Sequence, residues 1–226
     1  MYQWNWEVIA SYKYVFVQGA LVTLWLSLLV IALGTLLGLV LAFGSRSREL
    51  IVVWPIRIYV ILFRTLPVLV LLIWVYYVLP ILFGWNLSAF AAATIALSLH
   101  LSAFVSEALR SGIESVASTQ YESAMALGFS PWQTMLKIIL PQAIKNITPN
   151  LLGLYINEVK NSSLASIIAV NELLHRSNIL ISNTFRPLEI YTTVAVVYIL
   201  ILLPLGYLAH KVEIKFSAGR MAIKEF

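Results

Sequence analysis

The sequence predicts an all-α integral membrane protein with five transmembrane helices, an external N-terminus and a cytoplasmic C-terminus. Its composition is the first reason, because 61% of the residues are hydrophobic, only 11% are charged, and the mean hydropathy is +0.89. A soluble domain carries about 25% charged residues, so this chain lacks the charge to cover its own surface in water. The second reason is that long charge-free runs alternate with short basic segments, a pattern typical of membrane topology signals.

Five segments are suited to cross a bilayer, since a spanning helix needs about 20 mostly apolar residues. We expect the spans at about 19–43, 58–79, 87–109, 149–171 and 188–210. The charge-free run over residues 65–106 is too long for one helix, and Pro80 and Gly84 divide it. The second span must therefore begin early enough to contain Arg64, and we expect a kink at Pro67.

The basic residues predict the orientation. With the N-terminus outside, ten Lys and Arg residues lie in inner segments and three in outer segments. The inner ten are Arg46, Arg48, Arg57, Arg110, Lys137, Lys145, Lys211, Lys215, Arg220 and Lys224, and the outer three are Lys13, Arg176 and Arg186. Because short cytoplasmic loops carry the excess of positive charge, we expect residues 1–18 to form an extracytoplasmic tail, 19–210 the transmembrane domain and 211–226 a cytoplasmic tail. The first twelve residues carry only Glu7 as a charge, which is unlike a secretory signal.

The composition also excludes several classes of function. The sequence has no Cys and no Asp, which excludes disulfides, thiolate metal sites and catalysis by an aspartate. Its three His lie in separate segments, so we expect neither a metal site nor a catalytic centre. No Gly-x4-Gly-Lys-Ser/Thr loop is present to bind nucleotide phosphates, so we expect no enzymatic activity and no cofactor. The basic residues lie between apolar runs and not on a soluble face, which argues against a nucleic-acid partner.

The longest segment between spans, about 111–148, predicts a helix, a glycine turn and a second helix. Ser118 or Thr119 can cap the first helix, and Gly128 can end it. Ser130-Pro131 then opens the second helix with proline in its first position. An amphipathic hairpin lying on the bilayer would explain this pattern equally well on physical grounds alone.

The same segment contains a motif at fixed spacing. Glu122-Ser123-Ala124 is followed after three residues by Gly128 and after nine more by Ile138-Ile139-Leu140-Pro141. This spacing resembles the EAA loop of bacterial ATP-binding-cassette (ABC) importer permeases, with Ser123 in place of the first Ala. The resemblance extends over about residues 15–215. Phe63-Arg64 with Pro67, and Lys160-Asn161-Ser162-Ser163-Leu164, are similar to motifs of the polar amino acid subfamily.

This resemblance implies a type I ABC importer permease in the bacterial cytoplasmic (inner) membrane, working by alternating access. The implied partners are two copies of a cytoplasmic ABC ATPase, a second permease chain, identical or related, and an extracytoplasmic amino-acid-binding protein, with the lipid bilayer around the assembly. The ATPase would supply the energy and dock on the EAA loop. The residues implied in this coupling are Glu122, Ser123, Ala124, Gly128, Leu140 and Pro141.

The predicted fourth span contains charges about ten residues from its start, where a charged group normally faces a cavity or a partner. At 100° per residue, Glu158, Asn161 and Ser162 share one face of a helix, whereas Lys160 lies about 200° from Glu158. The shared face suits the ammonium or guanidinium group of a polar amino acid. A cationic amino acid is attractive for this reason, although any amino acid has an ammonium group. Lys160 would pair elsewhere or bind a carboxylate, and both charges could instead be structural at a dimer interface.

Two further charged residues and a histidine lie in or beside the predicted third span. Glu107 and Arg110, spaced i and i+3 at the inner end of the third span, are expected to form a structural or gating pair. His100 stands alone on an apolar helix and is interpreted as a packing residue.

The alternative function is an ion- or proton-coupled amino acid carrier or channel without an ATPase. Glu158 and Lys160 would allow it, but the EAA loop would then have no purpose.

Overall fold

The computed structural model describes residues 2–47 and 49–221, with side chains as far as Ile214. Every regular element in this described part is a helix. In chain order they are α1 (Glu7–Ser11), α2 (Lys13–Gly44), α3 (Leu50–Thr65), α4 (Val68–Ile73), the π-helix η1 (Trp74–Val78), α5 (Leu79–Phe83), α6 (Ala89–Glu114), α7 (Ser118–Ala126), α8 (Pro131–Thr134), the π-helix η2 (Met135–Ile139), α9 (Leu140–Asn161), the 3-10 helix η3 (Ser162–Ile168), α10 (Leu173–Thr184) and α11 (Pro187–Met221).

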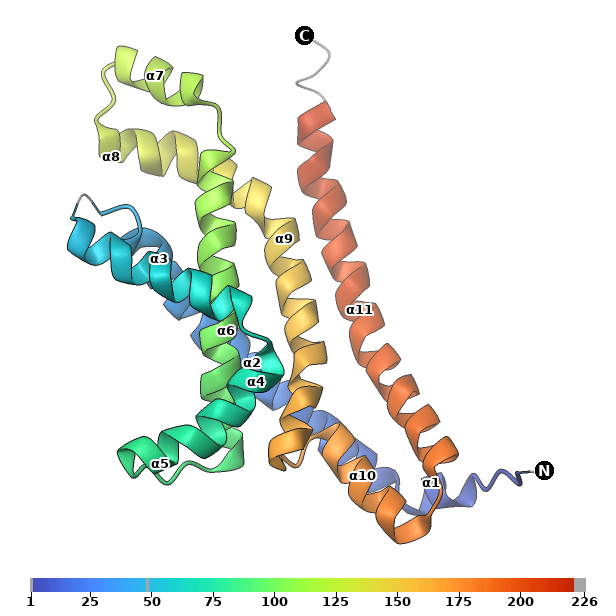
Figure 1. Cartoon of the computed structure of the whole chain (residues 1–226). Coiled ribbons are helices and arrows are strands. Elements are labelled where there is room, and N and C mark those ends of the chain that lie inside the picture. Colours follow the sequence, from blue (N-terminus) through green and yellow to red (C-terminus); the bar gives the residue numbers. More distant parts are fainter. Residues whose placement is uncertain (1, 48, 222–226) are drawn as a thin grey trace.

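Helices α2 and α6 form the centre of the fold, where they cross in close contact (Figure 1). Two glycines of α2 allow this approach. A Cβ atom at Gly34 would lie 3.0 Å from Leu101, and one at Gly38 would lie 2.7 Å from Val105. Small residues at these two positions therefore serve the close packing of α2 against α6. The main hydrophobic core forms around this crossing and extends to η1 and η3.

The second predicted span is not one continuous helix. Helix α3 ends at Thr65, and the α4–α5 segment begins at Val68 with its axis turned by 108°. Leu66 and Pro67 between them have extended backbone angles, with ψ of 131° and 129°. The cause is Pro67, because a residue before proline is forced out of the helical region. The expected kink at Pro67 is thus a full break.

The two π-helices have a common position relative to proline. Pro80 follows η1 and Pro141 follows η2, each as the second residue after the π-helix. A proline inside a helix lacks the N–H donor and clashes with the carbonyl four residues earlier. The wider π turn relieves this conflict, so the chain stays helical through both prolines. The second loop helix therefore does not end at Pro141 but continues through η2 into α9.

The fourth predicted span, 149–171, also differs from the helix observed. Helix α9 begins nine residues earlier, at Leu140, ends at Asn161 and is followed by η3 and by Ala169 in a left-handed conformation with φ of 61°. Ser162 and Ser163 donate hydrogen bonds to the carbonyls three residues before them, both at 2.8 Å. Serine hydroxyls that bond to the nearby backbone compete with the α-helical pattern, which explains the change to a 3-10 helix.

The two ends of the molecule carry different elements (Figure 1). One end contains the α7–α8 hairpin and the C-terminal part of α11, and the other contains α1, α5 and α10. Three helices of the described part, α2, α6 and the Pro187–Ile214 part of α11, are long and apolar enough to cross a membrane, and the bent pair of α3 with α4–α5 could supply a fourth span.

Candidate functional site

Glu158 is a buried carboxylate in the last turn of α9, with only 2% of its surface exposed. Its Oε2 atom accepts a hydrogen bond from the Asn161 amide at 3.5 Å. Its Oε1 atom has no hydrogen-bond partner among the described residues. The side chain lines a cavity of about 240 Å³ between α6 and α9. Because an unpartnered polar atom is costly to bury, this oxygen is suited to a ligand that donates a hydrogen bond or carries positive charge.

Only two of the four residues predicted to bind substrate line the cavity. Glu158 and Asn161 lie together at the cavity, as their shared helix face predicts. The hydroxyl of Ser162 is buried but donates to the Val159 carbonyl. Lys160 is exposed and does not line the cavity. Glu158 and Lys160 therefore do not neutralise each other within α9, which agrees with their angular separation on the helix.

Helix α6 supplies the opposite wall of the cavity. His100 and Phe104 lie there with ring centroids 4.9 Å apart, and Leu101 of α6 and Leu154 of α9 add apolar surface. Sequence reasoning interpreted His100 as a packing residue, and the structure places it in the same cavity as a buried carboxylate. Only the packing of α6 against α9 brings the two residues together, so neither helix alone carried a signal for it.

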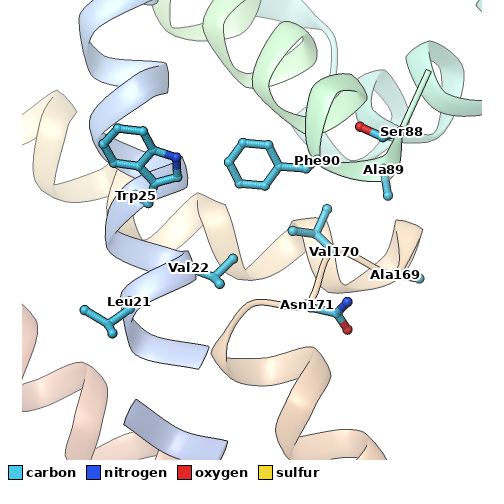
Figure 2. A pocket seen from close by; sticks show the side chains of 9 residues that line it. All are labelled: Leu21, Val22, Trp25, Ser88, Ala89, Phe90, Ala169, Val170 and Asn171. Atoms are coloured by element: carbon cyan, nitrogen blue, oxygen red, sulfur yellow. The ribbon is translucent and has the colours of Figure 1, made fainter. Parts of the chain in front are cut away.

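A larger cavity, of about 580 Å³, lies beside α2 and the start of α6 (Figure 2). It is bounded by α2, the start of α6 and the connection from η3 to α10. Trp25 and Phe90 approach it from α2 and α6, and its polar lining side chains are Ser88 and Asn171. None of the lining residues is charged, so this cavity provides no counter-charge for an ionic substrate. The Glu158 cavity is chemically the better candidate.

The α7–α8 hairpin is held by specific turn chemistry. Gly128 adopts φ of 83°, and the N–H groups of Gly128 and Phe129 bond to the carbonyls of Met125 and Ala124 at 3.0 and 3.1 Å. This bonding pattern ends α7 as a Schellman motif, which confirms the predicted glycine stop. Ser130 forms a capping box with Gln133, and proline follows at the start of α8. The predicted cap at Ser118 or Thr119 is wrong, because α7 already begins at Ser118 and its cap residue is Ala117.

The residues expected to couple to the ATPase occupy both arms of this hairpin. Glu122 and Ser123 are exposed on α7, while Ala124 is only 1% exposed and packs beneath the helix. Gly128 forms the turn. Leu140 and Pro141 lie in the first turn of α9, at the base of the second arm. The hairpin is joined to α6 at one end and to α9 at the other, the two helices that form the Glu158 cavity.

Glu107 and Arg110 belong to a larger ion-pair network at the hairpin end of α6. Arg110 binds Glu107 through two nitrogens, at 2.6 and 3.1 Å, and binds both oxygens of Glu114 at 2.6 and 2.7 Å. Arg64 of α3 approaches Glu107 to 3.6 Å and lies over the ring of Phe104. The network therefore connects α3 to α6 as well as bridging successive turns of α6.

Sequence reasoning missed two buried glutamates that hold the opposite end together. Glu172 caps α10 by accepting bonds from the N–H groups of Leu174 and His175 at 2.9 and 2.7 Å, and from the Thr23 and Tyr198 hydroxyls at 3.4 and 3.3 Å. Glutamate is not among the residues that usually mark a helix cap, so no sequence signal identified it.

Glu189, the second, is fully buried at the start of α11 and binds the N-terminal segment. Its carboxylate accepts hydrogen bonds from the Tyr2 hydroxyl and from the Asn5 N–H at 2.8 Å, and Arg186 lies 3.7 Å from it. The bond from Tyr2 to this anionic group raises the pKa of the Tyr2 phenol. The N-terminal segment is thereby fixed against α11 at the end opposite the hairpin.

Comparisons with known proteins agree with this architecture. The Probable amino-acid ABC transporter permease protein YckA of Bacillus subtilis is 37% identical over 190 residues, covering 84% of this chain and 83% of that protein. The Glutamine transport system permease protein GlnP of Escherichia coli is 31% identical over 212 residues, covering 93% and 97%. The crystal structure of an amino acid ABC transporter with histidines superposes with a TM-score of 0.90 at 32% identity, covering 95% of this chain and 100% of that one.

Residues 34–213 match the model of a protein family described as binding-protein-dependent transport system inner membrane component. The match covers most of the chain, including α6, the α7–α8 hairpin and α9. Such proteins are the non-enzymatic membrane components of ABC transporters, which agrees with the absence of a phosphate-binding loop from the sequence. This chain belongs to the family of binding-protein-dependent transport system inner membrane components.

Proposed function

We propose that this chain is the permease subunit of an ATP-driven importer that moves a polar amino acid into the bacterial cytoplasm by alternating access. The amino acid class is supported by the relatives named above. One structural observation carries the mechanism: the hairpin with the coupling motif is continuous with α6 and α9, the helices on either side of the buried Glu158. Movement of the hairpin by an ATPase would therefore change the relative position of the two cavity walls as rigid bodies.

Helix lengths and charge support the proposed topology. We assign the five spans to α2, the bent α3–α5 segment, α6, α9 and α11. From Asn146, after the inner Lys145, α9 has 16 residues, about 24 Å of a hydrocarbon core of about 30 Å, and η3 continues the segment beyond Asn161. The excess of basic residues on the side of the hairpin and the end of α11 supports a cytoplasmic location for both. Four of the ten basic residues counted on the inner side lie outside the described side chains: Arg48, Lys215, Arg220 and Lys224.

We assign the Glu158 cavity to the substrate ammonium group. Glu158 supplies the negative charge, and the Asn161 amide fixes its orientation from one side. Ser162 supports this arrangement by bonding to the last turn of α9. Lys160, exposed outside the cavity, is assigned to a carboxylate of the substrate or of the second permease chain. Glu107 and Arg110, within the network at the cytoplasmic end of α6, are assigned to gating.

We assign the exposed face of α7 to an ABC ATPase. Glu122 and Ser123 provide polar contacts on this face, Ala124 keeps α7 packed, and Gly128, Leu140 and Pro141 shape the hairpin. Two ATPase copies would bind two permease chains, identical or related, one at each hairpin. An extracytoplasmic amino-acid-binding protein would meet the opposite end, where the N-terminal segment is fixed to α11. The assembly would lie in the bacterial cytoplasmic membrane as a multi-pass protein.

The test is an affinity purification of the tagged chain from its native membranes after mild crosslinking, with mass spectrometric identification of its partners. Wild type should retain an ABC ATPase, and Glu122→Ala should lose it. Glu49→Ala is the matched control, because Glu49 is also exposed and lies in a loop assigned to the same side. If no ATPase is retained by wild type, the autonomous carrier becomes the better interpretation.

A further inference from the structure

A cavity of about 630 Å³ lies between α3 and the end of α6 that leads to the hairpin. It is separate from the Glu158 cavity, and the two share no lining residue. Four arginines line it: Arg46 from the turn after α2, Arg57 and Arg64 from α3, and Arg110 from α6. Arginine is the residue best suited to bind an oxyanion through two parallel hydrogen bonds.

The charge of this cavity is not balanced by the residues around it. Glu107 and Glu114 are its acidic lining residues, and both bind Arg110, while Glu107 also approaches Arg64. The guanidinium groups of Arg46 and Arg57 have no hydrogen-bonded or ionic partner within the described part of the chain. The lining therefore has an excess of two positive charges, and two arginines are available to a ligand.

Helix α3 places these arginines beside a surface suited to lipid. Ile51, Trp54, Ile58 and Ile61 are between 55% and 83% exposed. At 100° per residue they form one stripe, with Arg57 and Arg64 on its flank and about 20° apart from each other. An apolar stripe with an exposed Trp and with arginines at its edge is typical of a helical segment that meets the membrane–water interface.

We propose that this cavity binds the phosphodiester headgroup of an anionic phospholipid, with Arg46 and Arg57 holding the phosphate and the acyl chains following the apolar stripe of α3. Basic cavities between transmembrane helices on the cytoplasmic side are suited to such headgroups. The stripe favours a lipid over a soluble phosphate compound, because only a lipid has chains to cover it. The proposal depends on the proposed topology in one respect only: the lipid would come from the inner leaflet of the membrane.

Occupancy of the site would affect the ion-pair network. Arg64, Glu107 and Arg110 line the same cavity, and α6 leads from them directly to α7. A bound anion would attract Arg64 and compete with Glu107 for it. The lipid would thus act on the helix that connects the substrate cavity to the coupling hairpin.

The binding test uses native mass spectrometry of the full-length chain, with whatever subunits co-purify, in a neutral detergent. Phosphatidylglycerol and phosphatidylcholine with identical acyl chains are titrated separately. Wild type should bind phosphatidylglycerol more tightly. Arg46→Gln and Arg57→Gln should each reduce that preference about fivefold. Arg57→Lys should retain most of it, which separates loss of charge from loss of folding. Lys145→Gln is the control, because Lys145 is exposed on the same proposed side outside the cavity.

Three results would overturn the proposal. The preference for phosphatidylglycerol could be absent from wild type, or it could persist when both arginines are replaced by Gln. Inorganic phosphate could also displace phosphatidylglycerol at millimolar concentration from wild type, which would indicate a site for soluble phosphate. None of these readouts depends on transport or on ATPase docking. Failure of the lipid site is therefore distinguishable from failure of the proposed function.

Discussion

The contact between Gly112 of α6 and Ile147 of α9 should be the most sensitive position at the base of the α7–α8 hairpin. A Cβ atom at Gly112 would lie 1.7 Å from Ile147 Cγ2 and 3.2 Å from Ile147 Cβ. Carbon atoms in contact normally lie about 3.5–4.0 Å apart, so Gly112→Ala would require a shift of about 2 Å. Ile147 cannot simply rotate away, because isoleucine has one strongly preferred χ1 rotamer in a helix.

The expected cost follows from two opposing effects. Overpacking of this kind costs about 1–3 kcal/mol, whereas replacing glycine by alanine inside a helix gains about 1 kcal/mol. Gly153 in α9 is the matched control, since a Cβ there would meet no atom within 4 Å. Gly153→Ala should therefore stabilise the protein. The two variants should differ by about 1–3 kcal/mol, or about 2–12 °C in melting temperature for a chain of this size.

Thermal unfolding of both variants in the same detergent, followed by tryptophan fluorescence, would measure this difference. The Ile147→Ala background provides a second test, because it removes the atom that clashes. Gly112→Ala should lose its penalty there, giving a coupling energy of about 1–3 kcal/mol between the two positions. Equal melting temperatures for Gly112→Ala and Gly153→Ala would refute the close approach of α6 and α9.

Three other predictions concern the Glu158 cavity, the α7–α8 hairpin and the opposite end of the molecule. Glu158→Gln should abolish or strongly reduce uptake in proteoliposomes while ATPase docking persists, because the counter-charge for the ammonium group is lost; normal uptake would refute the site. Gly128→Ala should destabilise the hairpin by about 1–2 kcal/mol, since alanine is strained at φ of 83°. Limited proteolysis should then cut faster between α7 and α8, and an unchanged cleavage rate would contradict the strain. Glu172→Ala should lower the melting temperature, because the hydrogen bonds that Glu172 accepts from α10, Thr23 and Tyr198 are lost at a cost of about 1–3 kcal/mol. Glu7→Ala, at an exposed position, should leave the melting temperature unchanged.

The sequence determined the class of the protein and much of its local structure. Composition alone argued against a soluble domain, and the motif that contains Glu122, Gly128 and Pro141 marked the segment that forms the α7–α8 hairpin. The hairpin's turn was predictable because its chemistry is local. Only glycine readily adopts the backbone angles of Gly128, and Ser130-Pro131 satisfies the start of the next helix within four residues.

The sequence predicted less well where a helix begins, bends or ends. Pro67 signalled an irregularity, but the 108° turn depends on where the following segment packs. Pro141 lies inside a helical segment, because the π-helix before it lets the chain continue into α9. Proline and serine signals report a local conflict with the helix, whereas the packing around them decides how the conflict is resolved.

The candidate site shows the same division between local pattern and tertiary contact. The shared helix face of Glu158 and Asn161 followed from helical periodicity, because both residues lie on one helix. The sequence could not predict that His100 lies beside them, because α6 and α9 are distant in sequence. The contact between the two helices is not encoded in either helix alone. The arginine cavity is likewise formed by three separate segments. The sequence thus determined which residues carry charge within the membrane region, and only the tertiary structure decided which of them face one another, because burial and charge pairing depend on helix packing.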